Sequence, residues 1–456
     1  MFLKTFKAIN VYGYLDFDIS FNKDINFLVG GNGTGKTTAL KLINALLVPN
    51  FKELLTISFD SIELTIDHNE QIVNIQAKAN SEYVELSIND VDEKLDLPNY
   101  SKEEFEFYAA KKEGMDELIN ETNRKYADHQ IIKKISKLPS PIFLGLERRR
   151  ENGETENRSY YVERELWLKN SLNSRAVSAK RLIRGSLGIS LMETEFLVQN
   201  AYRELKNSEE KQADKLRDSI LSSSFQYTEF DFSLTPNKED FWSEKTSLLA
   251  RRKEIKDALS KIGTRDNRLI TEVDTFFDRL TSLFETMQLT KDEGGVTIEW
   301  LTNKAQIDRI SKVVEVIDEH KSKIDALFKP INDFLSTVNE FYEDSNKKLS
   351  IDTVGRLDVE RPDGKHCSIE GLSSGERQLL VIFAHAFFNQ YGRKNTVFII
   401  DEPELSLHLV WQEKFAETIL KIGPSSQFLL ATHSPEIIGI NKNKAIKCRQ
   451  QNASRT

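Results

Sequence analysis

Residues 30–37 read Gly-Gly-Asn-Gly-Thr-Gly-Lys-Thr and fit the phosphate-binding pattern G-x-x-x-x-G-K-[ST]. Glycines let such a loop turn its N–H groups inward, and the start of a following helix adds positive partial charge. We expect Lys36 to reach the β- and γ-phosphates of ATP and the Thr37 hydroxyl to coordinate Mg²⁺. A chance glycine-rich turn is the alternative. The predicted nucleotide-binding residues of the loop are Gly30, Asn32, Gly33, Gly35, Lys36, Thr37 and Thr38.

The segments on either side of this loop have the patterns that its chemistry requires. Ile25–Val29 is a short apolar run, which predicts a buried strand. Residues 37–47 carry apolar side chains at helical spacing, which predicts a helix that begins at the loop. A strand, a glycine loop and a helix in this order form a cradle for an anion.

Two adjacent carboxylates follow another apolar run far downstream. Residues 397–400 are apolar throughout, which is typical of a strand in the middle of a covered parallel sheet, and Asp401 and Glu402 follow at its carboxyl end. We expect Asp401 to hold Mg²⁺ and Glu402 to polarise the attacking water as general base. The alternative is a buried strand that ends in a solvated acidic turn.

A predicted helix with a serine at its start lies between the glycine loop and the carboxylate pair in the sequence. Residues 372–378 read Leu-Ser-Ser-Gly-Glu-Arg-Gln and precede an apolar helix that Ser373 is placed to cap. The stretch resembles the signature motif of ATP-binding-cassette ATPases, usually Leu-Ser-Gly-Gly-Gln, from which it departs at positions 374 and 376. The resemblance implies that Ser373, Gly375 and Glu376 contact nucleotide. The alternative is an ordinary capped helix.

Other motifs follow in the order of that family. Residues 403–408 resemble its D-loop, and His433, at the end of an apolar strand, resembles the switch histidine that contacts the γ-phosphate; an ordinary polar strand end is the alternative. Ile9–Leu15 and Pro141–Arg149 resemble segments of the soluble branch, which includes the recombination-repair heads and the overcoming-lysogenization-defect group. That resemblance implies that Glu147 senses Mg²⁺ or water. We therefore expect Lys36, Glu402 and His433 to be the catalytic residues.

The composition is that of a globular protein inside a cell. The chain has 456 residues, enough for two or three domains, of which 39% are hydrophobic and 29% are charged. Its two cysteines give neither a disulfide framework nor metal-ligand spacing, which indicates a reducing cytoplasm. We expect no signal peptide and no membrane span. The net charge of −8 does not indicate a general nucleic-acid-binding surface.

The motifs divide the chain into two halves of one head and an insertion. We expect residues 1–145 to hold the phosphate-binding loop and an antiparallel β subdomain, since residues 61–66 and 83–88 alternate between polar and apolar. Residues 346–456 hold the remaining motifs. The predicted fold class is α/β: a cassette-type ATPase head with a mixed sheet and flanking helices, interrupted by a mainly helical insertion at residues 146–345.

Two stripes of apolar residues at heptad spacing run through the insertion. They cover Leu269–Met287 and Ile310–Val338, with Gly294 and Gly295 between them, which predicts an antiparallel helical hairpin. Core packing within one helical domain and a projecting arm both account for the stripes. Basic clusters at residues 148–150 and 175–184 are compatible with phosphate contacts, but solvated helix faces explain them as well.

The family resemblance implies how such a head works. Ser373 and Gly375 of a second subunit would cover the γ-phosphate that Lys36 of the first subunit holds, so that ATP joins two heads in a homodimer or a higher oligomer. The insertion would then transmit opening and closing to a partner.

The motifs are most similar to those of the ATPase subunit of Septu-type antiphage systems (PtuA-like), relatives of which accompany some retrons. The resemblance implies control of a separate His-Asn-His nuclease subunit. Few residues follow His433, so we expect this chain to carry no nuclease domain. The alternatives are a DNA repair or recombination ATPase that binds duplex DNA directly, a transporter subunit and a non-enzymatic structural dimer.

Overall fold

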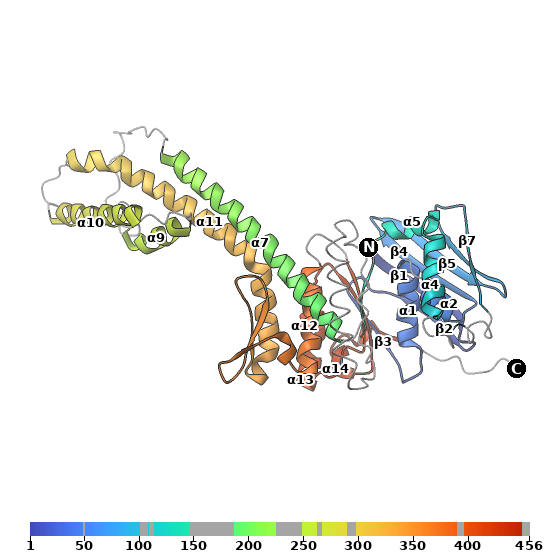
Figure 1. Cartoon of the computed structure of the whole chain (residues 1–456). Coiled ribbons are helices and arrows are strands. Elements are labelled where there is room, and N and C mark those ends of the chain that lie inside the picture. Colours follow the sequence, from blue (N-terminus) through green and yellow to red (C-terminus); the bar gives the residue numbers. More distant parts are fainter. Residues whose placement is uncertain are drawn as a thin grey trace. The chain divides into compact units, whose positions relative to one another are not determined.

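The structure is a computed structural model, in which two compact units can be distinguished (Figure 1). It describes residues 1–48, 51–100, 108, 114–145, 187–224, 249–261, 267–289, 298–389 and 396–448. The first unit, which we call the head, comprises Met1–Asn200 together with Phe334–Thr456, and the second comprises Ala201–Asp333. The long helices α7 (Leu187–Ser224) and α11 (Ile298–Tyr342) contribute residues to both units.

A five-stranded parallel sheet forms the centre of the head. Its order is β14-β3-β13-β12-β8, with β3 (Ile25–Val29), β8 (Ile142–Gly145), β12 (Val397–Asp401), β13 (Gln427–Thr432) and β14 (Ala445–Lys447). Nearly every residue of β3, β12 and β13 is buried, as in a sheet covered on both faces. The strand register pairs Asp401 with Ala431, and Thr432 with Val29. The carboxyl ends of these three strands therefore lie at one edge.

A second, antiparallel sheet of six strands belongs to the same head. Its order is β2-β1-β4-β5-β6-β7, with β1 (Phe2–Val11), β2 (Leu15–Ser20), β4 (Ser61–His68), β5 (Gln71–Ala79), β6 (Tyr83–Ile88) and β7 (Leu95–Pro98). In β4 and β6 every second residue is buried, so one face of the sheet packs on the core. The antiparallel subdomain predicted from the alternating runs is confirmed.

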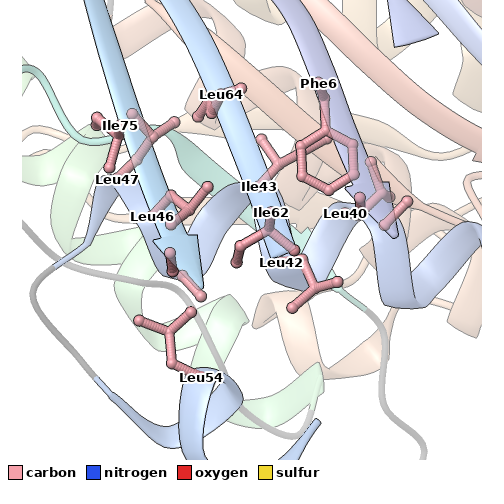
Figure 2. Packing of buried hydrophobic residues seen from close by; sticks show 14 of the residues in the cluster. Phe6, Leu40, Leu42, Ile43, Leu46, Leu47, Leu54, Ile62, Leu64 and Ile75 are labelled. Atoms are coloured by element: carbon pink, nitrogen blue, oxygen red, sulfur yellow. The ribbon is translucent and has the colours of Figure 1, made fainter. Parts of the chain in front are cut away.

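Helix α1 (Lys36–Leu47) follows the phosphate-binding loop and is buried between the two sheets. It contacts β4 of the antiparallel sheet as well as β12 and β13 of the parallel sheet. Figure 2 shows its apolar side chains, among them Leu40, Ile43 and Leu46, facing Phe6 and Leu64 of the antiparallel sheet. Each such side chain contributes roughly 1.5–3 kcal/mol when fully buried. The start of α1 is therefore held by a rigid core.

Shorter helices complete the amino-terminal half of the head. They are α2 (Lys52–Thr56), α4 (Gly114–Tyr126) and α5 (Gln130–Lys137). The apolar face of α5, with Ile131, Ile132 and Ile135, joins the same core as α1.

The carboxyl-terminal half supplies α12 (Ser374–Phe388), α13 (Leu409–Ile422), the short α14 (Pro435–Ile438) and a small sheet of order β11-β10-β9. The strands of that sheet are β9 (Lys348–Ile351), β10 (Leu357–Glu360) and β11 (His366–Cys367). Aromatic rings join α12 to its neighbours. The ring centroid of Phe383 lies 6.1 Å from that of Phe415 in α13 and 5.1 Å from that of Phe341 in α11. The helix that follows the signature-like motif is thus fixed on two sides.

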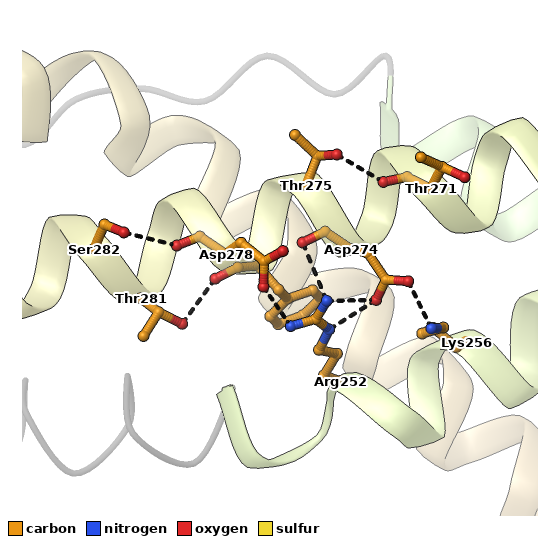
Figure 3. Close-up of polar contacts among 9 residues, drawn as sticks. Arg252, Lys256, Thr271, Asp274, Thr275, Asp278, Thr281 and Ser282 are labelled. Carbon is orange, nitrogen blue, oxygen red and sulfur yellow. Dashed lines mark hydrogen bonds and ion pairs between the residues drawn. The ribbon is translucent and has the colours of Figure 1, made fainter.

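The second unit is helical and has a small apolar core. Residues of α7, α9 (Arg252–Lys261), α10 (Asn267–Leu289) and α11 form this core, which contains Leu216, Ile255, Phe277, Leu280, Val314 and Ile317. Figure 3 shows Arg252 bonded to Asp274 and Asp278, with Lys256 also bonded to Asp274. Such partly exposed ion pairs contribute at most about 1 kcal/mol each, so apolar packing is the main stabilising term.

The α/β fold class, with mixed sheets and a helical insertion, is confirmed. Both apolar stripes predicted for the insertion lie on helices, α10 and α11. Gly294 and Gly295 lie outside the described residues. Within the described part of the chain, no helix has the length and apolar character needed to span a membrane.

Candidate nucleotide-binding site

The loop between β3 and α1 has the backbone of an anion cradle. Gly33 and Gly35 have φ values of 81° and 82°, a left-handed conformation that favours glycine. A Cβ on Gly35 would lie 2.8 Å from side-chain atoms of both Leu15 and Phe17, so a larger residue would also collide with β2. No side chain of the described residues caps the start of α1. The amides of its first turn therefore point toward the loop.

Three other predicted nucleotide-binding residues, Gly30, Asn32 and Thr38, belong to this loop or to the start of α1. Asn32 is exposed at the turn, and Thr38 is half-buried in the first turn of α1. A Cβ on Gly30 would lie 2.6 Å from the Thr34 hydroxyl oxygen and 3.2 Å from the Cys448 carbonyl oxygen. The loop entrance is therefore packed closely against its own turn and the end of β14.

Lys36 and His433 meet although they are 397 residues apart in the chain. The Lys36 ammonium donates to the carbonyl oxygens of Gly30 at 3.0 Å and Gly31 at 3.1 Å, and its Nζ lies 2.7 Å from His433 Nε2. Because an ammonium group has no acceptor, Nε2 accepts this bond. Lys36 is only 6% exposed, and burial lowers its pKa, while the carboxylates nearby act in the opposite direction. The residues expected to hold and sense the γ-phosphate are thus adjacent.

Thr37 and Asp401 form the second contact across the sheet edge. The Thr37 hydroxyl donates to Asp401 Oδ1 at 3.1 Å. Burial raises the pKa of Asp401 to about 6, the negative charge of Glu402 adds to this, and the bond from Thr37 opposes it. A hydroxyl and a carboxylate side by side are hard oxygen ligands that suit Mg²⁺, which takes its other ligands from phosphates and water. The donor set therefore fits the predicted cation.

Glu402 adopts an uncommon backbone conformation. Its φ is +51°, in the left-handed region that non-glycine residues seldom occupy, and its N–H donates to the Ala431 carbonyl oxygen at 2.8 Å. The negative charge of its side chain acts on both Asp401 and Lys36, so the carboxylate lies near both. Strained conformations of this kind cluster at functional sites. Its role as general base stays a prediction.

The signature-like segment forms a capping box at the start of α12. The Ser373 hydroxyl accepts from the Glu376 N–H at 3.3 Å, and the Ser373 N–H donates to Glu376 Oε2 at 2.6 Å. Glu376 is only 2% exposed and pairs with Lys347 at 2.7 Å. Burial favours a raised pKa for Glu376, but the bonds from Lys347 and Ser373 outweigh it and lower the pKa. The Glu376 carboxylate is therefore engaged within its own head.

Gly375 brings the start of α12 against the loop that follows β12. A Cβ at this position would lie 2.3 Å from the Ser406 carbonyl oxygen, so no larger residue fits without a shift of the backbone. Nearby, the Gln378 amide donates to the Pro403 carbonyl oxygen at 2.8 Å. The segment that resembles the D-loop thus packs against the segment that resembles the signature motif.

The structure adds Glu404, a residue that sequence reasoning did not single out. Its carboxylate accepts one hydrogen bond from the Thr432 hydroxyl at 2.8 Å and another from the His433 N–H at 2.6 Å. The sequence offered one indication of a role for Glu404: it is an acidic residue that directly follows Pro403, next to the Asp401–Glu402 pair. Nothing in the sequence indicated that this carboxylate faces the end of β13.

Glu147, the remaining predicted metal-sensing residue, lies outside the described residues, as do the basic clusters at residues 148–150 and 175–184. The strand that precedes Glu147 is described: Gly145, the last residue of β8, pairs with Asp401 of β12.

A glycine loop that begins a helix, a hydroxyl–carboxylate pair and a lysine at the edge of a parallel sheet are the parts of an ATPase site. The chain belongs to the family of AAA ATPase domains, whose sequence profile matches residues 1–438. It is 27% identical over 179 residues to the Retron Vc95 probable ATPase of Vibrio cholerae serotype O1 biovar El Tor. The match covers 35% of this chain and 33% of that protein, so it spans about a third of the relative's length.

Among solved structures, the chain is similar to head domains of Smc proteins. One is the Smc head with an extended coiled coil bound to the C-terminal domain of ScpA, from Pyrococcus furiosus, at 14% identity and a TM-score of 0.41. Another is the Smc head with a coiled coil and joint from Pyrococcus yayanosii, at 16% identity and a TM-score of 0.36. Each alignment covers 98% of this chain and 94% of the other.

Proposed function

We propose that this chain is a cassette-type ATPase whose heads close in pairs around ATP and thereby control a separate effector in antiphage defence. The observation that carries the ATPase part is the meeting of four residues at one sheet edge. Lys36 lies 2.7 Å from His433, and Thr37 lies 3.1 Å from Asp401, although the loop and the other two residues are distant in the chain.

Each of these residues has a task in hydrolysis. Lys36 exchanges its bonds to loop carbonyl oxygens for the β- and γ-phosphate oxygens, while the amides at the start of α1 bind the remaining phosphate charge. Thr37 and Asp401 hold Mg²⁺, which neutralises charge on the phosphates. Glu402 accepts the proton of the attacking water. His433, next to Lys36, contacts the γ-phosphate and reports its presence.

Closure by a second copy requires an anion-binding surface elsewhere on the head. The start of α12 is the surface proposed for this role, because Ser373 is exposed there and the first N–H groups of a helix have no acceptor in the preceding turn, although the Ser373 hydroxyl already accepts from the Glu376 N–H. In the proposed dimer, Ser373 and Gly375 of one protomer face the γ-phosphate bound by Lys36 of the other. ATP then has a higher affinity for the closed pair, so hydrolysis shifts the population toward separated heads.

The defence part of the proposal is supported by the likeness to the retron ATPase over about a third of the chain. The resemblance of the motifs to those of Septu-type ATPase subunits, noted in the sequence, points in the same direction. On this proposal the effector is a separate nuclease subunit of the His-Asn-His type. Neighbouring reading frames that encode a small nuclease, together with a complex of the two co-expressed proteins, would support it. Hydrolysis stimulated by duplex DNA without any second protein would favour the repair ATPase instead.

The experiment that tests the ATPase mechanism uses two variants of the full chain. Glu402→Gln removes the base but keeps the shape of the side chain, so it should bind ATP, fail to hydrolyse it and accumulate as dimers on a sizing column with ATP and Mg²⁺. Lys36→Ala should lose nucleotide binding and elute as a monomer under the same conditions. A Glu402→Gln protein that stays monomeric would refute closure by a second copy, and an unchanged affinity of Lys36→Ala for ATP would refute the role of the loop.

A further inference from the structure

The turn that carries His433 is organised around the carboxylate of Glu404. One oxygen, Oε1, accepts from the backbone N–H of His433 at 2.6 Å, and the other, Oε2, accepts from the Thr432 hydroxyl at 2.8 Å. The same Thr432 oxygen accepts from the Ser434 N–H at 3.0 Å. Three consecutive residues at the end of β13 are therefore bonded directly or indirectly to one side chain. Hydrogen bonds to an ionised carboxylate are about twice as strong as those between neutral groups.

Glu404 is itself firmly placed. Its own carbonyl oxygen accepts from the Leu407 N–H at 3.0 Å, and the carbonyl oxygen of the preceding Pro403 accepts from the Gln378 amide of α12. The loop that carries the carboxylate is thus bonded to a buried helix. The His433 ring, in contrast, belongs to an exposed residue, so the backbone of the turn largely decides where the ring points.

We propose that Glu404 is a positioning residue for His433. By fixing the backbone at the end of β13, it directs Nε2 toward Lys36, at 2.7 Å, and toward the phosphate that Lys36 is proposed to hold. The inference rests on the proposed ATPase function. It differs from a role in catalysis or metal binding, because both carboxylate oxygens are engaged by groups of the turn, the Thr432 hydroxyl and the His433 N–H.

The proposal predicts a specific pattern in hydrolysis kinetics. Glu404→Ala removes both acceptors, and Glu404→Gln keeps one acceptor but directs an amide N–H₂ at the Thr432 hydroxyl. Misplacement of a reacting group by about 1 Å costs on the order of 100-fold in rate. We therefore expect kcat to fall roughly 10-fold to 100-fold for Glu404→Ala, with a smaller loss for Glu404→Gln, while KM for ATP changes less than about threefold.

A double-mutant comparison separates positioning from other roles. If Glu404 acts through His433, Glu404→Ala should lower kcat in the parent protein but leave it unchanged in a His433→Ala background. A further loss of more than about threefold in that background would overturn the proposal and indicate a direct role in chemistry or metal binding. Glu436→Gln is the matched control, since Glu436 accepts from the Ser434 hydroxyl at 2.9 Å on the same turn but has no bond to His433. It should retain parental kcat.

A measurement without turnover distinguishes failure of this inference from failure of the proposed function. In Lys36→Ala protein, amide hydrogen exchange at His433 should become at least about tenfold faster when Glu404→Ala is added, because the N–H loses its acceptor. Unchanged exchange at this amide would overturn the positioning role even if the protein hydrolyses ATP. Absence of hydrolysis in the parent protein, with faster exchange at His433, would refute the ATPase proposal and leave the structural link intact.

Discussion

Replacement of Asp401 by asparagine should make the head more stable while it removes the predicted metal ligand. In the structure Asp401 is half-buried, accepts from the Thr37 hydroxyl at 3.1 Å and lies near the negative charge of Glu402. Asparagine keeps an oxygen that can accept from Thr37 and removes the charge that burial disfavours. The natural residue therefore costs stability that the predicted Mg²⁺ would offset.

The size of that cost follows from the pKa of Asp401. Its ordinary value of 3.8 is raised to about 6, and one pKa unit equals about 1.4 kcal/mol, which gives an upper limit of about 3 kcal/mol. Because the pKa is higher in the folded protein than in the unfolded chain, the folded state binds the proton more tightly. Stability therefore falls as the pH rises from about 4 to about 6, and the cost is fully present above pH 6. Solvent near the half-buried carboxylate reduces the expected gain to about 1–3 kcal/mol.

Thermal unfolding without nucleotide tests this reasoning. Asp401→Asn should raise the unfolding midpoint of the head by about 2–6 °C at pH 7.5, and the difference should shrink toward pH 4.5, where Asp401 takes up a proton. Mg²⁺ with ATP should raise the midpoint of the parent protein more than that of the variant. A variant no more stable than the parent at pH 7.5, or a gain that is the same at both pH values, would refute the argument.

Asp24 provides a control of opposite sign. Burial favours a raised pKa for Asp24, but the bonds from Lys444 and from the Ile25 N–H outweigh it, so the pKa is lowered. A lowered pKa contributes stability above pH 4, which is lost as the pH falls. Asp24→Asn should therefore lower the midpoint at pH 7.5, although both variants remove one negative charge.

Two further predictions concern the start of α12. Gly375→Ala should lower the free energy of unfolding of the head by about 1–3 kcal/mol, because its Cβ would lie 2.3 Å from the Ser406 carbonyl oxygen. Denaturant unfolding measures this difference. A variant as stable as the parent would show that the loop around Ser406 can shift at no cost. Glu376→Gln should also lower the stability of the head, because the buried partner of Lys347 loses its charge. Adding Lys347→Met should restore part of the lost stability. A double variant that is less stable than Glu376→Gln alone would contradict this reasoning.

Much of the candidate site could be predicted because its geometry follows from backbone patterns. The apolar runs before Gly30 and before Asp401 predict buried strands, and parallel strands place their carboxyl ends at one edge. The register of β3, β13 and β12 then brings Thr37 beside Asp401 and Lys36 beside His433. The continuous apolar runs and the helical spacing after the glycine loop were enough to assign these elements, and the motifs indicated which side chains to look for.

The contacts that orient the site could not be predicted in the same way. Glu404 reaches His433 because of a turn in which Glu402 and Ser406 both have positive φ, and neither residue type indicates such a conformation. Lys347 pairs with Glu376 across 29 residues of chain. Such pairings depend on how loops fold onto a finished core, and no local pattern of residues specifies them.

The glutamate at position 376 shows why a departure from a family motif has to be interpreted together with its neighbours. The carboxylate accepts from both the Ser373 N–H and the Lys347 ammonium, so it completes a capping box and neutralises a cation at once. A glutamine could make the first bond, but its amide would leave the Lys347 charge without an anionic partner. The glutamate is therefore matched to Lys347. Its carboxylate is only 2% exposed and Gly375 is buried as well, so Ser373 is the exposed residue among the three that this motif predicts to contact nucleotide.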